Sequence, residues 1–171
     1  MSNSSSTVFN PRAGQDDQRH LGAAWLVSGY GALLATITLG GIDRPPYDDS
    51  YFFKRFALNL LDHGVFAWNV SDGPVYGNTS QLFQLIVVAV TSLTRTHTLL
   101  ALRVLLACTL LCGFAISLRT SLRRGSLIAS AVGFCSPVVL FSVLSGMETA
   151  VVFAGLALLC AVVDPEHEAE P

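Results

Sequence analysis

The sequence predicts an all-α membrane protein: a polytopic bundle of transmembrane helices with an outer loop that carries an interfacial helix. Three observations predict this fold class. Hydrophobic residues make up 51% of the 171 residues and charged residues 13%, against about 25% charged residues in soluble domains. The mean hydropathy is +0.54. The apolar residues also form long blocks, whereas five of the twelve acids and several turn residues lie between the first two blocks.

The first apolar block predicts an uncleaved transmembrane helix. Leu21 to Ile42 contains 22 residues and no charge, enough at 1.5 Å per residue to cross a hydrocarbon core of roughly 30 Å. A signal peptide has a shorter apolar stretch and a small-residue cleavage site, but Asp43-Arg44-Pro45-Pro46 follows here. Residues 1–20 are polar and Ser-rich, which is typical of a disordered tail. We expect this tail on the cytoplasmic side of the plasma membrane.

A short helix is predicted in the outer loop, over Asp48 to Asp62. Phe52, Phe56 and Leu60 recur every four residues, as the apolar face of a helix does. Asp48 or Asp49 can cap its start, and Gly64 stands where helices often end. Because its other faces carry charged side chains, this helix should lie in the membrane interface rather than cross it.

The remainder of the outer loop, which extends over residues 43–97, is predicted to be irregular. The turn residues Asp72-Gly73-Pro74 indicate a tight hairpin or irregular loop within residues 65–80. The next apolar block, Leu82 to Leu93, has only 12 residues. That length favours a re-entrant or interfacial segment over a full span.

Three further apolar blocks predict membrane spans. Thr98–Leu118 is long enough to cross the membrane, and so is Ser126–Leu144, in which Pro137 is expected to kink the helix. Ala150–Val163 is shorter, at 14 residues. The last residues, Asp164–Pro171, form an acidic tail that should be solvated.

The side of the membrane on which each later loop lies depends on whether Leu82–Leu93 crosses the membrane. If it does not cross, five of the ten Lys and Arg residues are cytoplasmic, namely Arg12, Arg19, Arg119, Arg123 and Arg124. If it crosses, four are cytoplasmic, namely Arg12, Arg19, Arg95 and Arg103. Because cytoplasmic loops carry an excess of Lys and Arg and the block is short, the sequence favours the first arrangement. Glu148 then emerges on the same outer side as Asp48 and Asp49.

Several functions are disfavoured by charge and residue spacing. The net charge of −2 is too small to suggest nucleic acid or another polyanion as a partner. His63 and His97 have no partners at ligand spacing, which disfavours a zinc site. A secreted disulfide framework is also disfavoured, because all four cysteines lie inside apolar blocks: Cys108, Cys112, Cys135 and Cys160.

The acids Asp48, Asp49 and Glu148 are the candidates for chemistry. Asp48 and Asp49 open an interfacial helix, where a carboxylate can act as a general base toward a hydroxyl or bind a divalent metal that holds a phosphate. Glu148 interrupts apolar sequence on both sides, and an acid near the bilayer suggests function. On spacing alone a capping pair and an ordinary loop residue remain alternatives. Arg55 could bind a phosphate as a fork or simply meet lipid headgroups.

These residues carry a resemblance to a known family. Two separate parts of the chain resemble GT-C membrane glycosyltransferases, in particular the arabinofuranosyltransferase-like branch of actinobacterial cell-wall synthesis. The later part is Ser145-Gly146-Met147-Glu148-Thr149-Ala150. The earlier part resembles the first outer loop of the family and comprises Asp48-Asp49-Ser50-Tyr51, Arg55-Phe56-Ala57, Asn59-Leu60, His63-Gly64, Trp68-Asn69 and Gly77-Asn78-Thr79.

The resemblance implies a mechanism. Members take a sugar from a polyprenyl-phosphate carrier and pass it to an acceptor on the outer face of the membrane. By that resemblance Asp48 is the base that deprotonates the acceptor hydroxyl, Asp49 positions the acceptor or a divalent metal, and Glu148 lines the same pocket. It further implies substrate-binding positions at Arg55, Asn59 and Asn69. No cofactor is required by the resemblance, and a divalent metal at Asp48 and Asp49 stays open.

The resemblance covers roughly residues 20–163, whereas members are several times longer and have around ten or more spans. The expectation is therefore the N-terminal portion of such an enzyme, incomplete by itself, which acts with a missing C-terminal part or a partner subunit. The alternative is a small non-catalytic membrane protein that serves as an assembly partner or scaffold. Half of a transporter is less favoured, because no predicted span carries a charge near its middle.

Overall fold

The computed structural model describes residues 11–41, 48–75, 80–124 and 127–163. Within these residues it is helical, with no β-strand, which confirms the predicted all-α class. The elements in chain order are α1 (Pro11–Gly40), α2 (Asp48–His63), the 3-10 turn η1 (Val70–Asp72), α3 (Gln81–Thr94), the 3-10 turn η2 (Arg95–His97), α4 (Thr98–Arg124), α5 (Leu127–Phe134), α6 (Pro137–Ser145) and α7 (Thr149–Val162).

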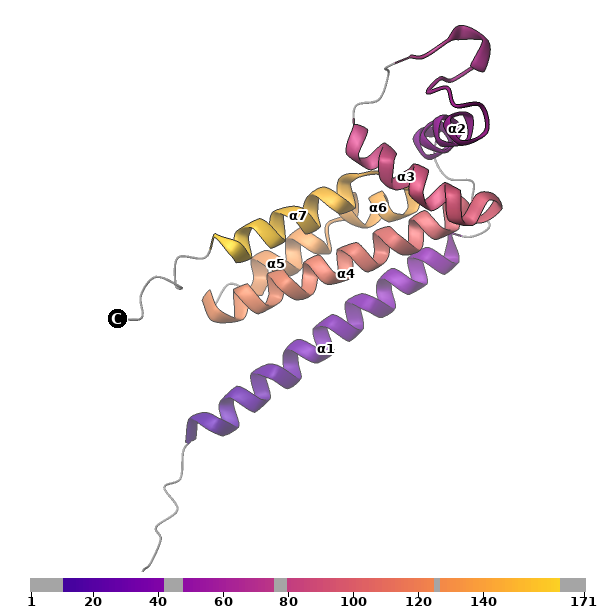
Figure 1. Cartoon of the computed structure of the whole chain (residues 1–171). Helices are drawn as coiled ribbons and strands as arrows, with labels where there is room; N and C mark the ends of the chain where they lie inside the picture. Colours follow the sequence, from indigo (N-terminus) through magenta and orange to yellow (C-terminus); the bar gives the residue numbers. More distant parts are fainter. Residues whose placement is uncertain (1–10, 42–47, 76–79, 125–126, 164–171) are drawn as a thin grey trace, which may run out of the picture.

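Helix α4 is the centre of the fold. It packs against α1, α5, α6 and α7, while α2 and α3 lie together across one end of the molecule (Figure 1). Its buried apolar side chains recur every four residues: Leu102, Leu106, Leu110, Phe114 and Leu118. This spacing places them on one face of the helix, so a single apolar stripe contacts the surrounding helices.

Two close contacts hold the neighbouring helices against α4. On α1, the Tyr30 ring lies 4.5 Å from that of Phe114, and its hydroxyl donates to the Phe134 carbonyl at 3.0 Å. On α7, the backbone comes so near Gly113 that a Cβ added there would lie 2.8 Å from the Cα of Ala154. Small residues at this crossing let α4 and α7 approach closely, as in helix pairs within membranes.

By length and composition, two helical stretches could cross a membrane: Gln18–Gly40 and Gln81–Leu122. A core helix of a soluble protein passes the same test but is mostly buried, whereas only 17% and 33% of these two windows is buried. Large apolar side chains are exposed on α1 and α7, including Trp25 at 71% and Leu159 at 57%. Apolar surface of this kind indicates association with a membrane.

Three predicted helical segments agree with the structure to within one residue at each end: Asp48–Asp62, Leu82–Leu93 and Ala150–Val163. Helix α4 begins at the predicted Thr98 but continues to Arg124, past the predicted end at Leu118. The helix predicted over Asp48–Asp62 is α2, and it ends at Gly64, which has φ of 70° and donates its N–H to Leu60. Helix α3 corresponds to the apolar block Leu82–Leu93, α4 to Thr98–Leu118 and α7 to Ala150–Val163. The outer loop beyond α2 contains η1 and Gly73, which has a positive φ of 74°. The loop closes through a hydrogen bond from the Val75 N–H to the Phe66 carbonyl at 2.9 Å.

The start of α1 differs from its prediction. The helix begins at Pro11, so the predicted disordered tail over residues 1–20 is wrong for residues 11–20. Proline fits the first position of a helix, because its fixed φ suits the turn and its missing N–H would have no partner there. The polar residues that follow include good helix formers, which lets the apolar helix extend toward its N-terminus.

The block Ser126–Leu144 also differs, because it forms two helices instead of one kinked span. α5 ends at Phe134 and α6 begins at Pro137. Ser136 has the extended ψ of 134°, the conformation that a following proline imposes. Pro137 therefore ends one helix and occupies the start of the next.

Some predicted segments lie outside the described residues. They are the tail residues 1–10, the acidic tail 164–171, the loop residues 42–47 and the stretch 76–79. The same holds for the side chains of Asp48 and Asp49, although the backbone of both residues opens α2.

Candidate functional site

The two segments that carry the candidate acids meet at the end of the molecule next to α2. The Ser50 hydroxyl, in the first turn of α2, donates a hydrogen bond to the Ser145 carbonyl at the end of α6. Both residues are buried, Ser50 to 1% and Ser145 to 0% exposure. The backbone of Asp48 and Asp49 precedes Ser50 directly, so the acidic start of α2 lies beside the loop between α6 and α7.

Gly146 makes this approach feasible. It ends α6 in the left-handed conformation, with φ of 70° and ψ of 32°, and its N–H donates to Ser142. A Cβ at this position would lie 2.7 Å from the Ser50 hydroxyl oxygen. Glycine is thus required both by the backbone conformation and by the close contact with α2.

Glu148 follows two residues later, at the start of α7. Its backbone carbonyl accepts from the N–H groups of Val151 at 2.9 Å and Val152 at 3.1 Å. Its side chain is half-buried and makes no capping hydrogen bond to α7. A role of this carboxylate in chemistry stays a prediction.

We call the region where the start of α2 meets the loop between α6 and α7 the junction. Arg103 also belongs to it, although the sequence did not predict Arg103 as a site residue. Its side chain is 5% exposed. Its Nε donates to the Leu144 carbonyl at 3.1 Å, and its Nη1 donates to the Gly41 carbonyl. It thereby joins the ends of α1 and α6 beside the Ser50 contact. The signal in the sequence is an arginine within the apolar first half of α4, because a buried arginine needs polar partners.

Two of the predicted substrate-binding residues, Arg55 and Asn59, lie on α2, and the third, Asn69, lies in the loop that follows it. Arg55 Nε donates to the Trp68 carbonyl at 2.8 Å, and its Nη2 donates to Asn69 Oδ1 at 2.9 Å. The guanidinium also stacks 4.4 Å from the centroid of the Trp68 ring. Arg55 therefore holds the loop after α2 through two hydrogen bonds and a cation–π contact.

Asn59 and Asn69 also hold this loop, and we call the three residues Arg55, Asn59 and Asn69 the loop clamp. Asn59 Nδ2 donates to the carbonyls of Ala67 at 2.8 Å and Trp68 at 3.0 Å. Asn69 Nδ2 donates to Asp72 Oδ2 at 2.9 Å. These contacts give all three residues a structural role in the loop, and substrate binding by them stays a prediction.

Aromatic rings fill the space between this loop and α2. The rings of Phe52 and Trp68 are stacked at 5.4 Å with 20° between their planes, and Phe56 lies 4.6 Å from Phe52. Trp68 is 38% exposed. Stacked rings of this kind form a rigid surface with an apolar face, next to the acidic start of α2.

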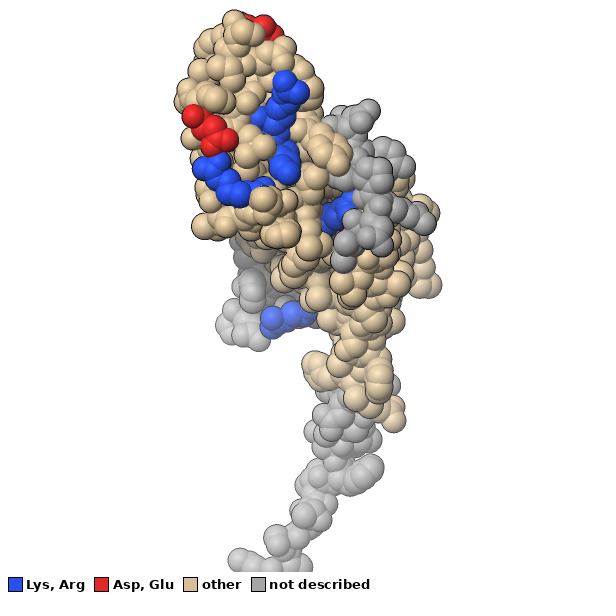
Figure 2. Space-filling model, turned by 90° about the vertical axis from the view of Figure 1, so that its right-hand side faces the viewer, with Lys and Arg blue, Asp and Glu red and all other residues tan. Residues whose placement is uncertain are grey.

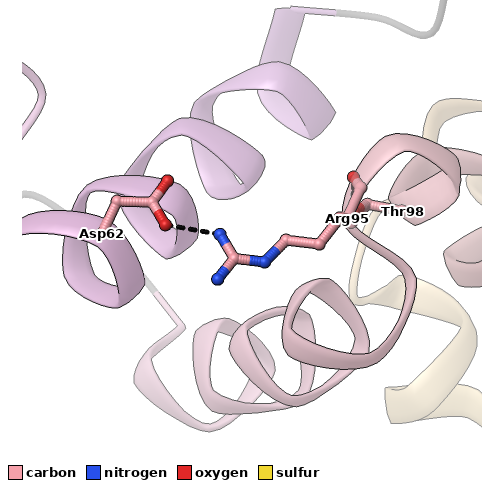
Figure 3. A network of polar contacts seen from close by, with 3 residues as sticks. All are labelled: Asp62, Arg95 and Thr98. Carbon is pink, nitrogen blue, oxygen red and sulfur yellow. Dashed lines mark hydrogen bonds and ion pairs between the residues drawn. The ribbon is translucent and has the colours of Figure 1, made fainter.

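An ion pair fixes the other end of α2. Arg95 in η2 reaches Asp62 on α2, and the Thr98 hydroxyl donates to the Arg95 carbonyl at 2.7 Å (Figure 3). In the view of Figure 2, basic and acidic side chains gather mainly over the end that carries α2 and α3, and most of the remaining described surface is uncharged. On this face the charged groups are thus gathered at the end that carries α2 and α3.

The described part of the chain contains no cluster of side chains that could bind a metal ion. No group of three His, Cys, Asp or Glu residues there could hold a metal ion. The predicted metal positions, Asp48 and Asp49, have side chains outside that part.

No protein-family model, curated protein or solved structure matches the chain.

Proposed function

We propose that this chain is the N-terminal portion of a membrane glycosyltransferase of the GT-C type. It would transfer a sugar from a polyprenyl-phosphate donor to an acceptor hydroxyl on the extracytoplasmic side. In this proposal the chain crosses the plasma membrane several times, its N-terminus is cytoplasmic, and a further segment or partner subunit completes the enzyme.

The hydrogen bond from Ser50 to Ser145 is the observation that supports this proposal. The resemblance involves two motifs, one that contains Ser50 and one that contains Ser145, and these two residues are 95 positions apart in the chain. Nothing in either motif requires the other to be near it. Their contact through a buried hydrogen bond and a left-handed glycine is the arrangement expected if Asp48, Asp49 and Glu148 serve one site.

The position of the junction also suits a lipid-linked donor. It lies where α1 and α6 end, and helices α1 and α7 extend away from it (Figure 1). Both helices carry exposed apolar side chains. A polyprenyl phosphate keeps its chain in the hydrocarbon and its phosphate at the headgroup level. An active site for such a donor therefore belongs at the end of the membrane helices.

The reaction requires one base and a leaving phosphate. The Asp48 carboxylate takes the proton of the acceptor hydroxyl while the hydroxyl oxygen attacks the anomeric carbon of the donor. The bond from that carbon to the phosphate oxygen breaks, polyprenyl phosphate leaves with the electron pair, and the anomeric configuration inverts. Asp49 orients the acceptor and Glu148 lines the pocket. Arg103 is a positioning residue, since it fixes the Leu144 backbone.

Replacement of Asp48 by Asn tests the proposal. Introduced at the chromosomal locus, this change keeps every partner of the protein present. Membranes are supplied with a labelled polyprenyl-phosphate arabinofuranose, and transfer to an acceptor glycan is measured. We expect transfer to fall by about 100-fold or more, with unchanged insertion of the protein into membranes. Asp62→Asn is the matched control and should retain transfer. Unchanged transfer in Asp48→Asn would falsify the proposed role of Asp48.

A non-catalytic assembly partner is the second candidate. The observation that favours it is the use of Arg55, Asn59 and Asn69 within the loop clamp. A shaped loop with exposed Trp68 could bind a partner protein instead of a sugar. Under this alternative Asp48→Asn has no effect, whereas Arg55→Ala reduces co-purification of the partner by loosening the loop.

A further inference from the structure

A groove lies between α1 and α4 at the end of the molecule opposite to α2. The two helices are close together near α2 and diverge toward the start of α1 (Figure 1). The groove between them has a volume of about 830 Å³. Its residues are Arg19, His20, Ala23, Ala24, Val27, Ser28, Ala115, Leu118, Arg119 and Leu122. A space of this size is comparable to the sites that hold drug-sized ligands.

The groove is apolar along its length and basic at one end. Small residues such as Ala23 and Ala115 leave it open, and the buried side chain of Leu118 forms part of its wall. Arg19 and Arg119 are both exposed, and no acid is among the described residues that line the groove. The charges are therefore complementary to an anion attached to an apolar chain.

The basic residues also lie near ends of the two stretches that could cross a membrane by length and composition. Arg19 stands at the start of the first stretch that could cross a membrane, Gln18–Gly40, and Arg119 stands near the end of the second, Gln81–Leu122. An anion bound by these guanidinium groups would be at the headgroup level, and an attached chain would run along the groove into the hydrocarbon. Guanidinium groups bind phosphate through paired hydrogen bonds.

We propose that this groove binds an anionic phospholipid of the bilayer, with its phosphate at Arg19 and Arg119 and an acyl chain between α1 and α4. Basic pockets between membrane helices bind anionic headgroups in this way. The site is separate from the proposed transferase site, because it lies at the other end of α1 and hence at the other leaflet. It does not depend on the chain being a glycosyltransferase.

Lipid preference of the purified full chain tests this proposal. The chain in detergent is mixed with phosphatidylglycerol or with phosphatidylcholine of the same acyl chains, and bound lipid is counted by native mass spectrometry. We expect the chain to retain phosphatidylglycerol preferentially. The double variant Arg19→Gln/Arg119→Gln should weaken this binding by about tenfold or more. Equal retention of both lipids by the unmodified chain would overturn the proposal.

Two further variants separate the groove from general charge attraction. Lys54→Gln/Arg95→Gln removes the same charge at the other end of the molecule and should keep the preference. Ala115→Trp fills the groove while both arginines remain and should abolish lipid retention. If the control variant loses the preference equally, or if Ala115→Trp retains the lipid, the groove is not the site. Dimers of the unmodified chain that exclude the lipid would show that a second copy occupies the groove, which also overturns the proposal.

Discussion

The side-chain hydroxyl of Ser50 donates a hydrogen bond to the backbone carbonyl of Ser145, 95 residues further along the chain. This contact joins the acidic start of α2 to the loop that carries Glu148. Two features support it: Gly146 gives the loop its left-handed turn, and Arg103 holds the preceding carbonyl of Leu144. The junction is thus fixed by buried polar contacts rather than by apolar packing alone.

Replacement of Gly146 by Ala should destabilise the junction. Alanine disfavours φ of 70°, and its Cβ would lie 2.7 Å from the Ser50 oxygen. We expect a loss of about 1–3 kcal/mol, measured as a lower midpoint of thermal unfolding in detergent. Gly133→Ala is the matched control, because a Cβ there meets nothing within 4 Å. It should be neutral or stabilising by up to about 1 kcal/mol. Equal effects of the two changes would contradict this view of the junction.

Arg103 and Arg95 should differ sharply in their contribution to stability. Arg103→Ala leaves two backbone carbonyls without their donor in a buried place, which should cost about 1.5–3 kcal/mol or more. The Arg95–Asp62 pair is exposed, at 53% and 44%, so Arg95→Ala should cost at most about 1 kcal/mol and less at high salt. Thermal unfolding of both variants at low and high salt tests this, and a larger loss for Arg95→Ala would refute it.

The loop clamp predicts faster local opening when Arg55 is changed to Ala. The N–H of Val75, which donates to the Phe66 carbonyl inside the loop, is a suitable reporter. Loss of the two Arg55 hydrogen bonds should speed its hydrogen exchange roughly tenfold. Arg55→Lys should not restore protection, because lysine lacks the planar fork that reaches both the Trp68 carbonyl and Asn69. Lys54→Ala should leave the rate unchanged; if it has the same effect, the clamp is not specific to Arg55.

The sequence predicted local elements well where a periodic pattern and a turn residue agreed. Helix α2 shows this, because its aromatic repeat and Gly64 indicate both its course and its end. The helix break before Pro137 was underestimated, since a proline in an apolar run can either kink a helix or end it. The start of α1 was placed too late because the polar residues after Pro11 carry no apolar periodicity.

The site was predictable only in part. The acids stood out because they interrupt apolar sequence, but the contact between Ser50 and Ser145 depends on how the helices pack and has no local signal. The roles of Arg55, Asn59 and Asn69 in the loop clamp also come from tertiary contacts. Arg103 can be recognised from the sequence as a residue with a buried role, because an arginine inside an apolar helix needs buried partners.

Photochemical labelling tests most directly whether the start of α2 and the Glu148 loop form one site for a polyprenyl phosphate. The probe is a polyprenyl phosphate with a diazirine on its first isoprene unit, and unlabelled polyprenyl phosphate serves as competitor. After irradiation of the full chain in membranes, adducts are mapped by mass spectrometry. We expect competable adducts in residues 48–55 and in residues 145–149. Labelling confined to other segments, such as the groove residues 19–28 and 115–122, would contradict the proposed site.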